Sequence, residues 1–430
     1  MDKKLKAIRA AKLKASLKKV HKAKAEAKVT SDVEYDDAED QYSSPDEEDL
    51  EDYKKGGYHP VNIGDKFNNN RYVILRKLGW GHFSTVWLTK DEKENRQVAM
   101  KVVKSAVQYS DAAKDEIKLL SKVKSANPDS EGKKYVVELL DSFVHHGPNG
   151  EHICMIFEVL GENLLGLIRR FPRGIPKNLV KKMTLQILKG LDYLHRECGI
   201  IHTDLKPENV LVCVDILPEL NNNHQNSLNG NDRENPIKLS KPLTIFKDDE
   251  EDLDLDNEAE ERYKNIQVKI ADLGNACWVD EHFTDSIQTR QYRSPEVIVG
   301  SKWNETADIW SLACMVIELL TGDFLFEPHS GQRFDKNDDH LAQMSELLGP
   351  FPRSITHRGK YSSDFFNKKG ALRKISRLRF WSLYDVLIDK YHFSLTEADL
   401  LRNFLLPMLD FSVDNRAKAY QLLDNKWLLE

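Results

Sequence analysis

The feature that most constrains this chain is a short polar loop enclosed by apolar residues at 200–211, IIHTDLKPENVL. Apolar flanks of this kind are typical of buried strands, so the polar side chains between them must lie in a loop held from both sides. Asp204 can accept a proton from a hydroxyl, and Lys206 points the same way in an extended segment. Asn209 offers the neutral oxygen ligand that suits a hard cation such as Mg²⁺. The spacing therefore favours a catalytic loop over an ordinary turn.

Other segments supply the partners that such a loop would need. Downstream, the apolar run 270–274 ends in a carboxylate, Asp272, and a glycine. Upstream, a glycine-rich loop at 79–86 is followed by a strand that carries Lys101. This order of parts is the signature set of protein kinases, in which Asp272 and Asn209 would share one Mg²⁺. The sequence therefore predicts ATP-dependent phosphoryl transfer.

Length and composition bound the remaining possibilities. The chain has 430 residues, 40% of them hydrophobic, which is enough for two or three domains with a sizeable core. Its five cysteines (154, 198, 213, 277 and 314) have no disulfide or metal spacing, so we expect a reducing intracellular compartment. No apolar run reaches membrane-spanning length, and the lysine-rich start lacks the apolar core of a secretory signal.

The first 57 residues carry charge in two opposite blocks. Residues 1–28 contain ten lysines and one arginine, and they read as a solvated, partly helical tail, with nuclear import or an acidic partner as the alternative. Residues 31–52 contain twelve acidic residues and no basic ones, so this block should repel itself and be disordered. We expect a disordered extension over 1–57 and order from Tyr58 onward.

The rest of the chain predicts an α+β fold with two lobes, the bilobal protein-kinase architecture. A small antiparallel sheet with one helix is expected over 58–158, with strands at 71–75, 85–88, 98–103, 136–143 and 153–158 and a helix at 112–123. A larger helical lobe is expected over 159–214 and 266–430, with helices at 179–194, 306–320, 340–348 and 396–405. A nucleotide would lie in the cleft between the lobes.

Residues 215–265 interrupt the helical lobe. This spacer is rich in asparagine and then acidic, with ten acidic residues between 248 and 261. It separates Asn209 from Asp272, which must share one metal site, so it must loop out. A tolerated surface insertion and a regulatory or anchoring segment remain equal alternatives.

The nucleotide site can be assigned in outline. Gly79 and Gly81 let the backbone approach phosphates, Phe83 can cap the loop, and Ser84 stands where a third glycine is usual. The backbone of the hinge at 157–160 would bond adenine, and apolar side chains would enclose its ring. The expected ATP-binding residues are Leu78, Gly79, Trp80, Gly81, His82, Phe83, Ser84, Val86, Ala99, Lys101, Glu158, Leu160 and Leu211.

Two ion pairs are expected from the sequence. Lys101 on a buried strand needs a partner, and Glu116 on the next helix is the candidate, with a surface pair between Glu116 and Lys114 or Lys118 as the alternative. Glu296, in the Ser-Pro-Glu that closes the segment after Asp272, could pair with Arg416 in a structural role. Asp308 and Trp310 should begin a buried helix that braces the catalytic loop.

Several stretches resemble the SR-protein kinases, within the CMGC group that includes cyclin-dependent and MAP kinases. The most specific are LGWGHFSTVWL at 78–88, IHTDLKPENVL at 201–211, IADLGNACWVDEHFTDSIQTRQYR at 270–293 and FLFEPHSG at 324–331. The spacer also matches the family's habit of dividing its kinase domain. The resemblance covers roughly 58–213 and 266–430.

The resemblance implies a serine kinase that acts on Arg/Ser-rich tails of splicing and mRNA-handling proteins. It implies a docking groove at Asp323, Asp339, Glu346 and Lys390, and a basic pocket for phosphorylated substrate at Arg290, Arg293 and Lys336. Thr203 stands where regulated kinases carry an arginine that binds a phosphorylated loop, which implies constitutive activity. We further expect ATP and Mg²⁺ as cofactors, chaperone or anchoring contacts through the spacer, a monomer in cytoplasm and nucleus, and neither nucleic acid nor membrane as a partner.

Two other functions remain open at this point. One is a dual-specificity kinase of the same group, which Thr203, Trp80 and the spacer disfavour. The other is a scaffold that binds Arg-rich chains without catalysis, which the full set of catalytic residues disfavours. Turnover of ATP with Mg²⁺, and a comparison of Arg-Ser with Ser-Pro peptides, would separate these readings.

Overall fold

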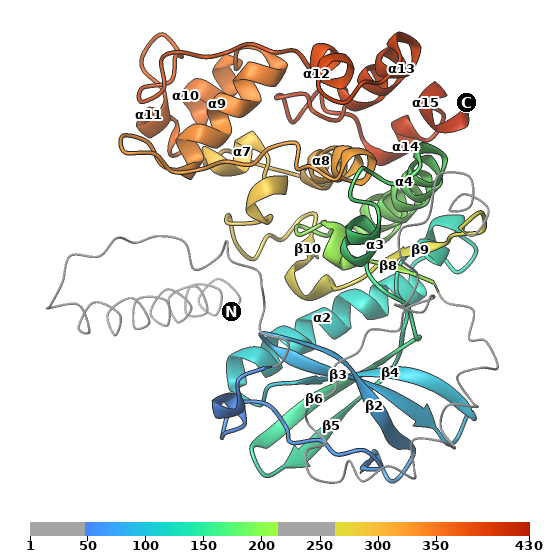
Figure 1. Ribbon diagram of the computed structural model, residues 1–430. Helices are drawn as coiled ribbons and strands as arrows, with labels where there is room; N and C mark the ends of the chain where they lie inside the picture. Colours follow the sequence, from blue (N-terminus) through green and yellow to red (C-terminus); the bar gives the residue numbers. More distant parts are fainter. Residues whose placement is uncertain (1–47, 214–262) are drawn as a thin grey trace, which may run out of the picture. The chain divides into compact units, whose positions relative to one another are not determined.

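A computed structural model describes residues 48–213 and 263–430, and Figure 1 shows their arrangement. The first part is a six-stranded antiparallel sheet in the order β1-β2-β3-β4-β6-β5. The long helix α2 (Val107–Ser125) follows β4 and lies along the sheet. The strands are β1 (Lys66–Phe67), β2 (Tyr72–Gly81), β3 (Ser84–Asp91), β4 (Arg96–Val103), β5 (Leu139–Gly147) and β6 (Gly150–Phe157).

The sheet buries both of its faces, as the alternation along β6 illustrates. Cys154 and Ile156 join a cluster around Trp87 on one face. Ile153 and Met155 join the larger core that includes α2 on the other face. Successive side chains of a strand point to opposite faces, so near-continuous apolar strands such as β6 fit this double burial.

The described structure includes residues from Glu48 onward, ten positions before the expected start of order at Tyr58. We call residues 48–58 the N-terminal strap. Two of its acidic residues have basic partners in the sheet lobe: Glu48 forms a buried ion pair with Lys77, and Asp52 lies 2.7 Å from the ammonium of Lys104. The prediction of disorder up to residue 57 is therefore wrong for the strap, because it counted repulsion within the acidic block and not these distant cations. Residues 1–47, with the lysine-rich tail, lie outside the described residues.

The second part is mostly helical and contains a core built around α4 and α8 (Figure 1). The predicted helix at 340–348 starts earlier in the structure, because Asp335 caps the first turn and forms a capping box with Asp338. The helices are α3 (Leu164–Arg170), α4 (Lys177–Asp192), α7 (Pro295–Ile298), α8 (Thr306–Thr321), α9 (Lys336–Leu348), α10 (Arg353–Arg358), α11 (Ser362–Phe365), α12 (Leu383–Asp389), α13 (Leu395–Leu405), α14 (Ala419–Leu422) and α15 (Lys426–Leu429). Among the described residues, no helix is both long enough and apolar enough to cross a membrane.

Two short strand pairs organise the loops between α4 and α8. Strand β7 (Ile200–Ile201) pairs with β10 (Cys277–Trp278), and β8 (Val210–Val212) pairs with β9 (Val268–Ile270). Beyond β8 and β9, the amide of Cys213 donates to the carbonyl of Gln267 over 2.8 Å. The chain thus leaves and re-enters the described part at one strand pair, and the predicted spacer falls almost wholly in residues 214–262, outside the description.

The predicted pair between Glu296 and Arg416 forms and is fully buried. The guanidinium is bidentate, with nitrogen–oxygen distances of 2.7 and 2.8 Å. It also donates to the carbonyl of Asp410 at 2.9 Å. A buried charge pair is tolerated when its geometry is good and its remaining donors are satisfied, and this pair meets both conditions.

Candidate active site

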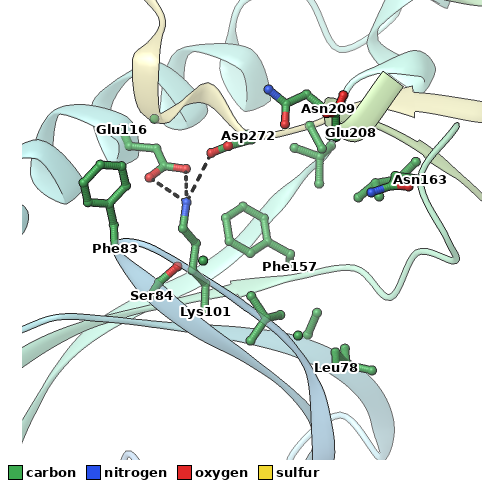
Figure 2. Close-up of a pocket in the computed structure, with 18 of the residues that line it drawn as sticks. Leu78, Phe83, Ser84, Lys101, Glu116, Phe157, Asn163, Glu208, Asn209 and Asp272 are labelled. Carbon is green, nitrogen blue, oxygen red and sulfur yellow. Dashed lines mark hydrogen bonds and ion pairs between the residues drawn. The ribbon is translucent and has the colours of Figure 1, made fainter. Parts of the chain in front are cut away.

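One cavity of about 730 Å³ lies under the β2–β3 turn, and all thirteen residues expected to bind ATP line it. The same cavity is lined by the side chains expected to act on phosphate and metal: Glu116, Asp204, Lys206, Asn209 and Asp272. Figure 2 shows Leu78, Phe83 and Ser84 on the sheet side and Asn209 and Asp272 on the opposite side. The motifs that were read separately along the chain therefore meet at one place.

Lys101 lies at the centre of a charge cluster. Its ammonium is 2.9 and 3.1 Å from the two carboxylate oxygens of Glu116 on α2, and 3.4 Å from Oδ1 of Asp272 (Figure 2). Burial would lower the pKa of Lys101, but the charges of Glu116 and Asp272 outweigh it and raise the pKa above its usual value. The ammonium in turn lowers the pKa of Asp272. Burial raises the pKa of Glu116, and the ammonium of Lys101 opposes this rise. Lys101 and Asp272 are therefore charged near neutral pH, and the alternative pairing of Glu116 on the helix surface does not occur.

Asp272 and Asn209 are held together by the backbone. The amide of Ala271 donates to the carbonyl of Asn209 over 2.9 Å, directly beyond the β8–β9 pair. The side-chain amide nitrogen of Asn209 donates to the carbonyl of Asp204 over 2.8 Å, which leaves its oxygen as an acceptor. One carboxylate and one amide oxygen fit Mg²⁺, which usually takes one or two protein oxygens together with phosphates and water.

The carboxylate of Asp204 is held by Thr289, a residue that the sequence analysis did not identify. The Thr289 hydroxyl donates to Oδ1 of Asp204 at 2.7 Å, and its amide donates to the same oxygen at 3.2 Å. The ammonium of Lys206 lies 3.0 Å from Oδ2 of Asp204 and 2.9 Å from the Thr289 hydroxyl. These contacts fix the carboxylate in one orientation at the mouth of the cavity.

Asp308 stabilises the catalytic loop through hydrogen bonds, as expected. Its carboxylate accepts the backbone amides of His202 and Thr203, each at 2.8 Å, and also lies 2.8 Å from His195. Thr203 adopts a left-handed backbone conformation, with φ of 68°. Such a conformation is costly outside glycine and persists only where neighbours enforce it, which the Asp308 carboxylate does here.

Neutral hydrogen bonds connect this loop to the segment 272–296. The Thr203 hydroxyl donates to the carbonyl of Asn275 over 2.8 Å, and the Gln288 amide donates to the carbonyl of Thr203 over 2.9 Å. The side-chain amide of Gln288 is itself buried and bonds Ala307 and Ser294. Amide and hydroxyl groups thus hold the segment at Thr203, the position at which regulated kinases carry an arginine that binds a phosphorylated loop.

The sequence reading also missed part of the cavity wall. The carboxylate of Glu158 binds the ammonium of Lys269, with both distances 2.7 Å. Only the backbone of Glu158 is therefore available to bond adenine at the hinge. Phe157 projects into the cavity beside Lys101 (Figure 2). Other lining residues that went unnamed include Val137, Glu162, Asn163, Glu208 and Ala271. Val137, Glu162 and Asn163 lie outside the motifs, so only the folded structure brings them to the site, whereas Glu208 and Ala271 lie within motifs.

The four expected docking residues lie in the helical lobe, and each has a contact already. Asp323 and Lys390 form an ion pair of 2.9 Å. On α9, the Asp339 carboxylate accepts the amide of His329 at 2.9 Å, and the Glu346 carboxylate accepts the amide of Arg379 at 2.7 Å. The last two therefore order the loops beside α9 as well as presenting negative charge.

The three residues of the expected basic pocket surround the start of α9. Arg290 donates to the side-chain oxygen of Asn337, which follows Lys336 in the helix. Arg293 donates to the carbonyl of Gln288, with its closer nitrogen at 2.7 Å. Burial lowers the pKa of His340 well below its usual value, and the charges of Arg290 and Arg293 lower it further. Arg290 and Arg293 thus place positive charge near His340, on a helix whose first turn also carries Asp338 and Asp339.

Comparison with known proteins agrees with this geometry. The protein kinase domain family matches residues 72–218 and 252–428. The serine/threonine-protein kinase SRPK of Physarum polycephalum is 51% identical, over 92% of this chain and 94% of its own length. Protein kinase dsk1 of Schizosaccharomyces pombe is 44% identical, over 89% of this chain and 85% of its own length. Human SRSF protein kinase 3 is 37% identical, over 89% of this chain and 90% of its own length.

These matches confirm the predicted bilobal α+β fold and the predicted serine/threonine kinase activity, and they disfavour a non-catalytic scaffold. A protein kinase domain uses ATP and a divalent metal. The chain belongs to the protein kinase family and, within it, to the SR-protein kinases.

Proposed function

We propose that this kinase phosphorylates serines in Arg/Ser-rich tails of splicing and mRNA-handling proteins, with Mg²⁺ as its metal. The observation that carries the proposal is the convergence of Lys101, Asp272, Asn209 and Asp204 on one cavity, in a chain whose helix α9 carries acidic side chains in its first turn. The printed name of the human relative, SRSF protein kinase 3, points to the same class of substrate for that protein.

Each side chain has a defined task in this proposal. Asp204 accepts the proton of the substrate hydroxyl, and Lys206 donates to the phosphoryl group as it transfers. Lys101, held by Glu116, binds the α- and β-phosphates. Asn209 and Asp272 would hold Mg²⁺, which when bound neutralises charge between the β- and γ-phosphates. Backbone groups at Glu158 and Leu160 would bond adenine.

Acidic groups in the helical lobe support an Arg-rich substrate. Guanidinium groups bind carboxylates in a bidentate manner, and Asp323, Asp339 and Glu346 provide such carboxylates. Lys390 already neutralises part of Asp323, so an arginine at this position must compete with an ion pair of 2.9 Å. Arg290, Arg293 and Lys336 would receive serines that are already phosphorylated.

Constitutive activity is part of the proposal. The hydrogen bonds of Thr203 and Gln288 hold the segment 272–296 without a phosphate group. We further propose that the protein acts as a monomer in cytoplasm and nucleus, and that the spacer at 215–265 contacts chaperone or anchoring proteins.

The test is a kinase assay on two peptide sets with Mg-ATP and enzyme that has been treated with phosphatase. We expect transfer to serines in Arg-Ser repeats and little transfer to Ser-Pro peptides. Lys101→Met serves as the inactive control for contaminating kinases. Preference for Ser-Pro peptides, or activity only before phosphatase treatment, would contradict the proposed substrate or the proposed constitutive state, respectively.

A further inference from the structure

The N-terminal strap (residues 48–58) contacts strand β2 at both ends of the part that lines the cavity. Glu48 forms its buried ion pair with Lys77, immediately before Leu78. The hydroxyl of Tyr58 donates to the carbonyl of Gly81 over 2.7 Å, at the last residue of β2. Leu78 to Gly81 line the nucleotide cavity, so the strap brackets the segment that would cover the phosphates.

Tyr58 is held tightly in its place. Its side chain is almost completely buried, at 1% exposure. The ammonium of Lys104 lies 4.2 Å from the centre of its ring and is paired with Asp52 in the same strap. The ring of Tyr53 lies against it, with the ring centres 5.4 Å apart. A ring fixed on two sides directs its hydroxyl at one acceptor.

The strap itself is bonded to parts of the lobe that do not belong to the glycine loop. The amide of Gly56 donates to the carbonyl of Asn149 at 3.1 Å, in the β5–β6 turn. The amides of Ser105 and Ala106, between β4 and α2, donate to the carbonyls of Gly57 and Gly56 at 3.1 and 3.0 Å. The strap can therefore hold the end of β2 in a fixed position relative to the rest of the sheet.

Within the glycine loop, β2 pairs with β3 up to Gly81, which lies opposite Ser84. A Cβ atom added at Gly79 or Gly81 would meet no atom within 4 Å, so no side chain of the loop itself packs at these two positions. Glycine has more backbone freedom to lose than any other residue, and ordering such a loop over a ligand is correspondingly unfavourable. At the tip, the amide of Lys104 donates to the carbonyl of Phe83 over 2.9 Å. Contacts with residues outside the loop, such as this one, therefore fix the position of the loop relative to the cavity.

We infer that Tyr58 is a positioning residue for nucleotide binding, supported by the ion pair of Glu48. By fixing the Gly81 carbonyl it orders the glycine loop before the nucleotide arrives, which reduces the entropy lost on binding. This inference rests on the ATP site proposed above, and it concerns the affinity for nucleotide and not the choice of substrate.

Tyr58→Phe removes only the hydroxyl, and Tyr72→Phe is its matched control. Tyr72 lies at the other end of β2, is fully buried, and donates its hydroxyl to Asp141 at 2.7 Å, away from the cavity. Both changes delete one hydrogen bond from the same strand. We expect Tyr58→Phe alone to raise the KM for ATP and the Kd of a non-hydrolysable ATP analogue, about two- to tenfold. The KM for peptide should stay the same in both variants.

Amide hydrogen exchange gives a second readout that general destabilisation would not mimic. The amide hydrogens of residues 79–84 should exchange faster in Tyr58→Phe than in Tyr72→Phe. This difference should hold even if the two variants lose the same amount of melting temperature. A further variant, Glu48→Gln with Lys77→Met, replaces the buried ion pair without leaving a lone charge. It should fold and should also weaken nucleotide binding.

The outcomes separate this inference from the site on which it rests. If the parent protein binds the ATP analogue and the two tyrosine variants bind it equally well, the positioning role of Tyr58 is wrong while the ATP site stands. If the parent protein fails to bind the analogue with Mg²⁺ present, the ATP site itself is wrong, and the inference with it.

Discussion

The Thr289 hydroxyl donates a hydrogen bond to Oδ1 of Asp204 over 2.7 Å, across 85 positions of the chain. Thr289 belongs to the segment that also carries Arg290 and Arg293. The orientation of the catalytic carboxylate therefore depends on the same segment that would meet the substrate, and it can be tested at a residue other than Asp204.

Thr289→Val should lower kcat about two- to tenfold while leaving the KM for ATP unchanged. The change removes one hydroxyl contact to Asp204 and Lys206 but keeps the shape of the side chain. Thr289→Ser retains the hydroxyl and should restore most of the loss. Steady-state kinetics on an Arg-Ser peptide measures both, and equal rates for the valine and serine variants would contradict the positioning role.

Asp204→Asn and Lys101→Met should each lower phosphoryl transfer far more. Loss of a general base typically costs about 10²- to 10⁴-fold, and loss of a charged contact to a transferring group about 10²- to 10³-fold. Both variants should keep their melting temperature within a few degrees and should still bind peptide. Near-full turnover in either one would show that its assigned role is wrong.

The docking prediction concerns Asp339 and Glu346 on α9. Because both carboxylates also accept backbone amides, Asp339→Asn with Glu346→Gln is a cleaner change than alanine: it removes the charges and keeps an acceptor oxygen. Binding of a long Arg/Ser tail should weaken by about 1 kcal/mol per pair or less. The salt dependence of binding should also become less steep.

The control for the docking variant is turnover of an Arg-Ser peptide too short to reach α9. That rate depends on Asp204 and the metal site, so it should stay close to the parent's. Equal salt slopes for the two proteins, or an equal loss of short-peptide turnover, would remove these residues from the docking site.

Deletion of residues 217–262 should leave turnover of a short Arg-Ser peptide close to normal. Strands β8 and β9 pair directly, and Cys213 bonds Gln267 beyond them, so a short connection can replace the deleted stretch. Kinetics on a folded deletion variant, verified by its melting transition, provides the measurement. A folded variant without turnover would refute the prediction that the spacer loops away from the metal site.

Glu318 should make the stability of the protein depend on pH. Burial raises the pKa of Glu318 from 4.5 to about 7, where its carboxyl meets the hydroxyl of Tyr292. The folded state then holds a proton that the unfolded state releases, so its stabilising effect is complete below pH 4.5 and is lost as the pH rises through 7. Glu318→Gln should therefore gain stability relative to the parent between pH 5 and 8, by about 3 kcal/mol at most.

Chemical denaturation at several pH values measures the Glu318 effect. Glu131→Gln is a control of opposite sign, because a hydrogen bond from Lys189 lowers the pKa of that exposed carboxyl. Its contribution is present above the unfolded pKa and is lost on acidification. Parallel pH curves for Glu318→Gln and the parent would show that Glu318 ionises normally.

Local motifs allowed much of the site to be predicted from the sequence. Lys101, Asp204, Asn209 and Asp272 each lie in a short pattern whose spacing alone indicates its chemistry, and the structure gathers all four around one cavity. The strands and buried helices could also be located, because the burial of one face makes apolar residues repeat with the period of a strand or of a helix. The start of α9 was placed too late, because its first turn is polar and depends on the Asp335 cap.

Apart from the expected pair of Glu296 with Arg416, contacts between distant segments could not be predicted in the same way. Thr289 and Gln288 sit in a stretch without catalytic spacing, and their importance comes from Asp204 and Thr203 far upstream. The acidic block at 31–52 predicts disorder for most of the strap, but Lys77 and Lys104 pair with Glu48 and Asp52 in the fold. Pairwise charge complementarity across the chain carries no local signature.

The buried pair of Glu296 with Arg416 has a consequence for the timing of synthesis. Glu296 is the last residue of the segment 272–296, but its guanidinium partner, Arg416, is synthesised 120 positions later. Until then the nascent chain would have to bury an uncompensated carboxylate, which costs several kcal/mol. A chain synthesised only as far as Glu296 therefore lacks the charge that balances this carboxylate in the folded protein.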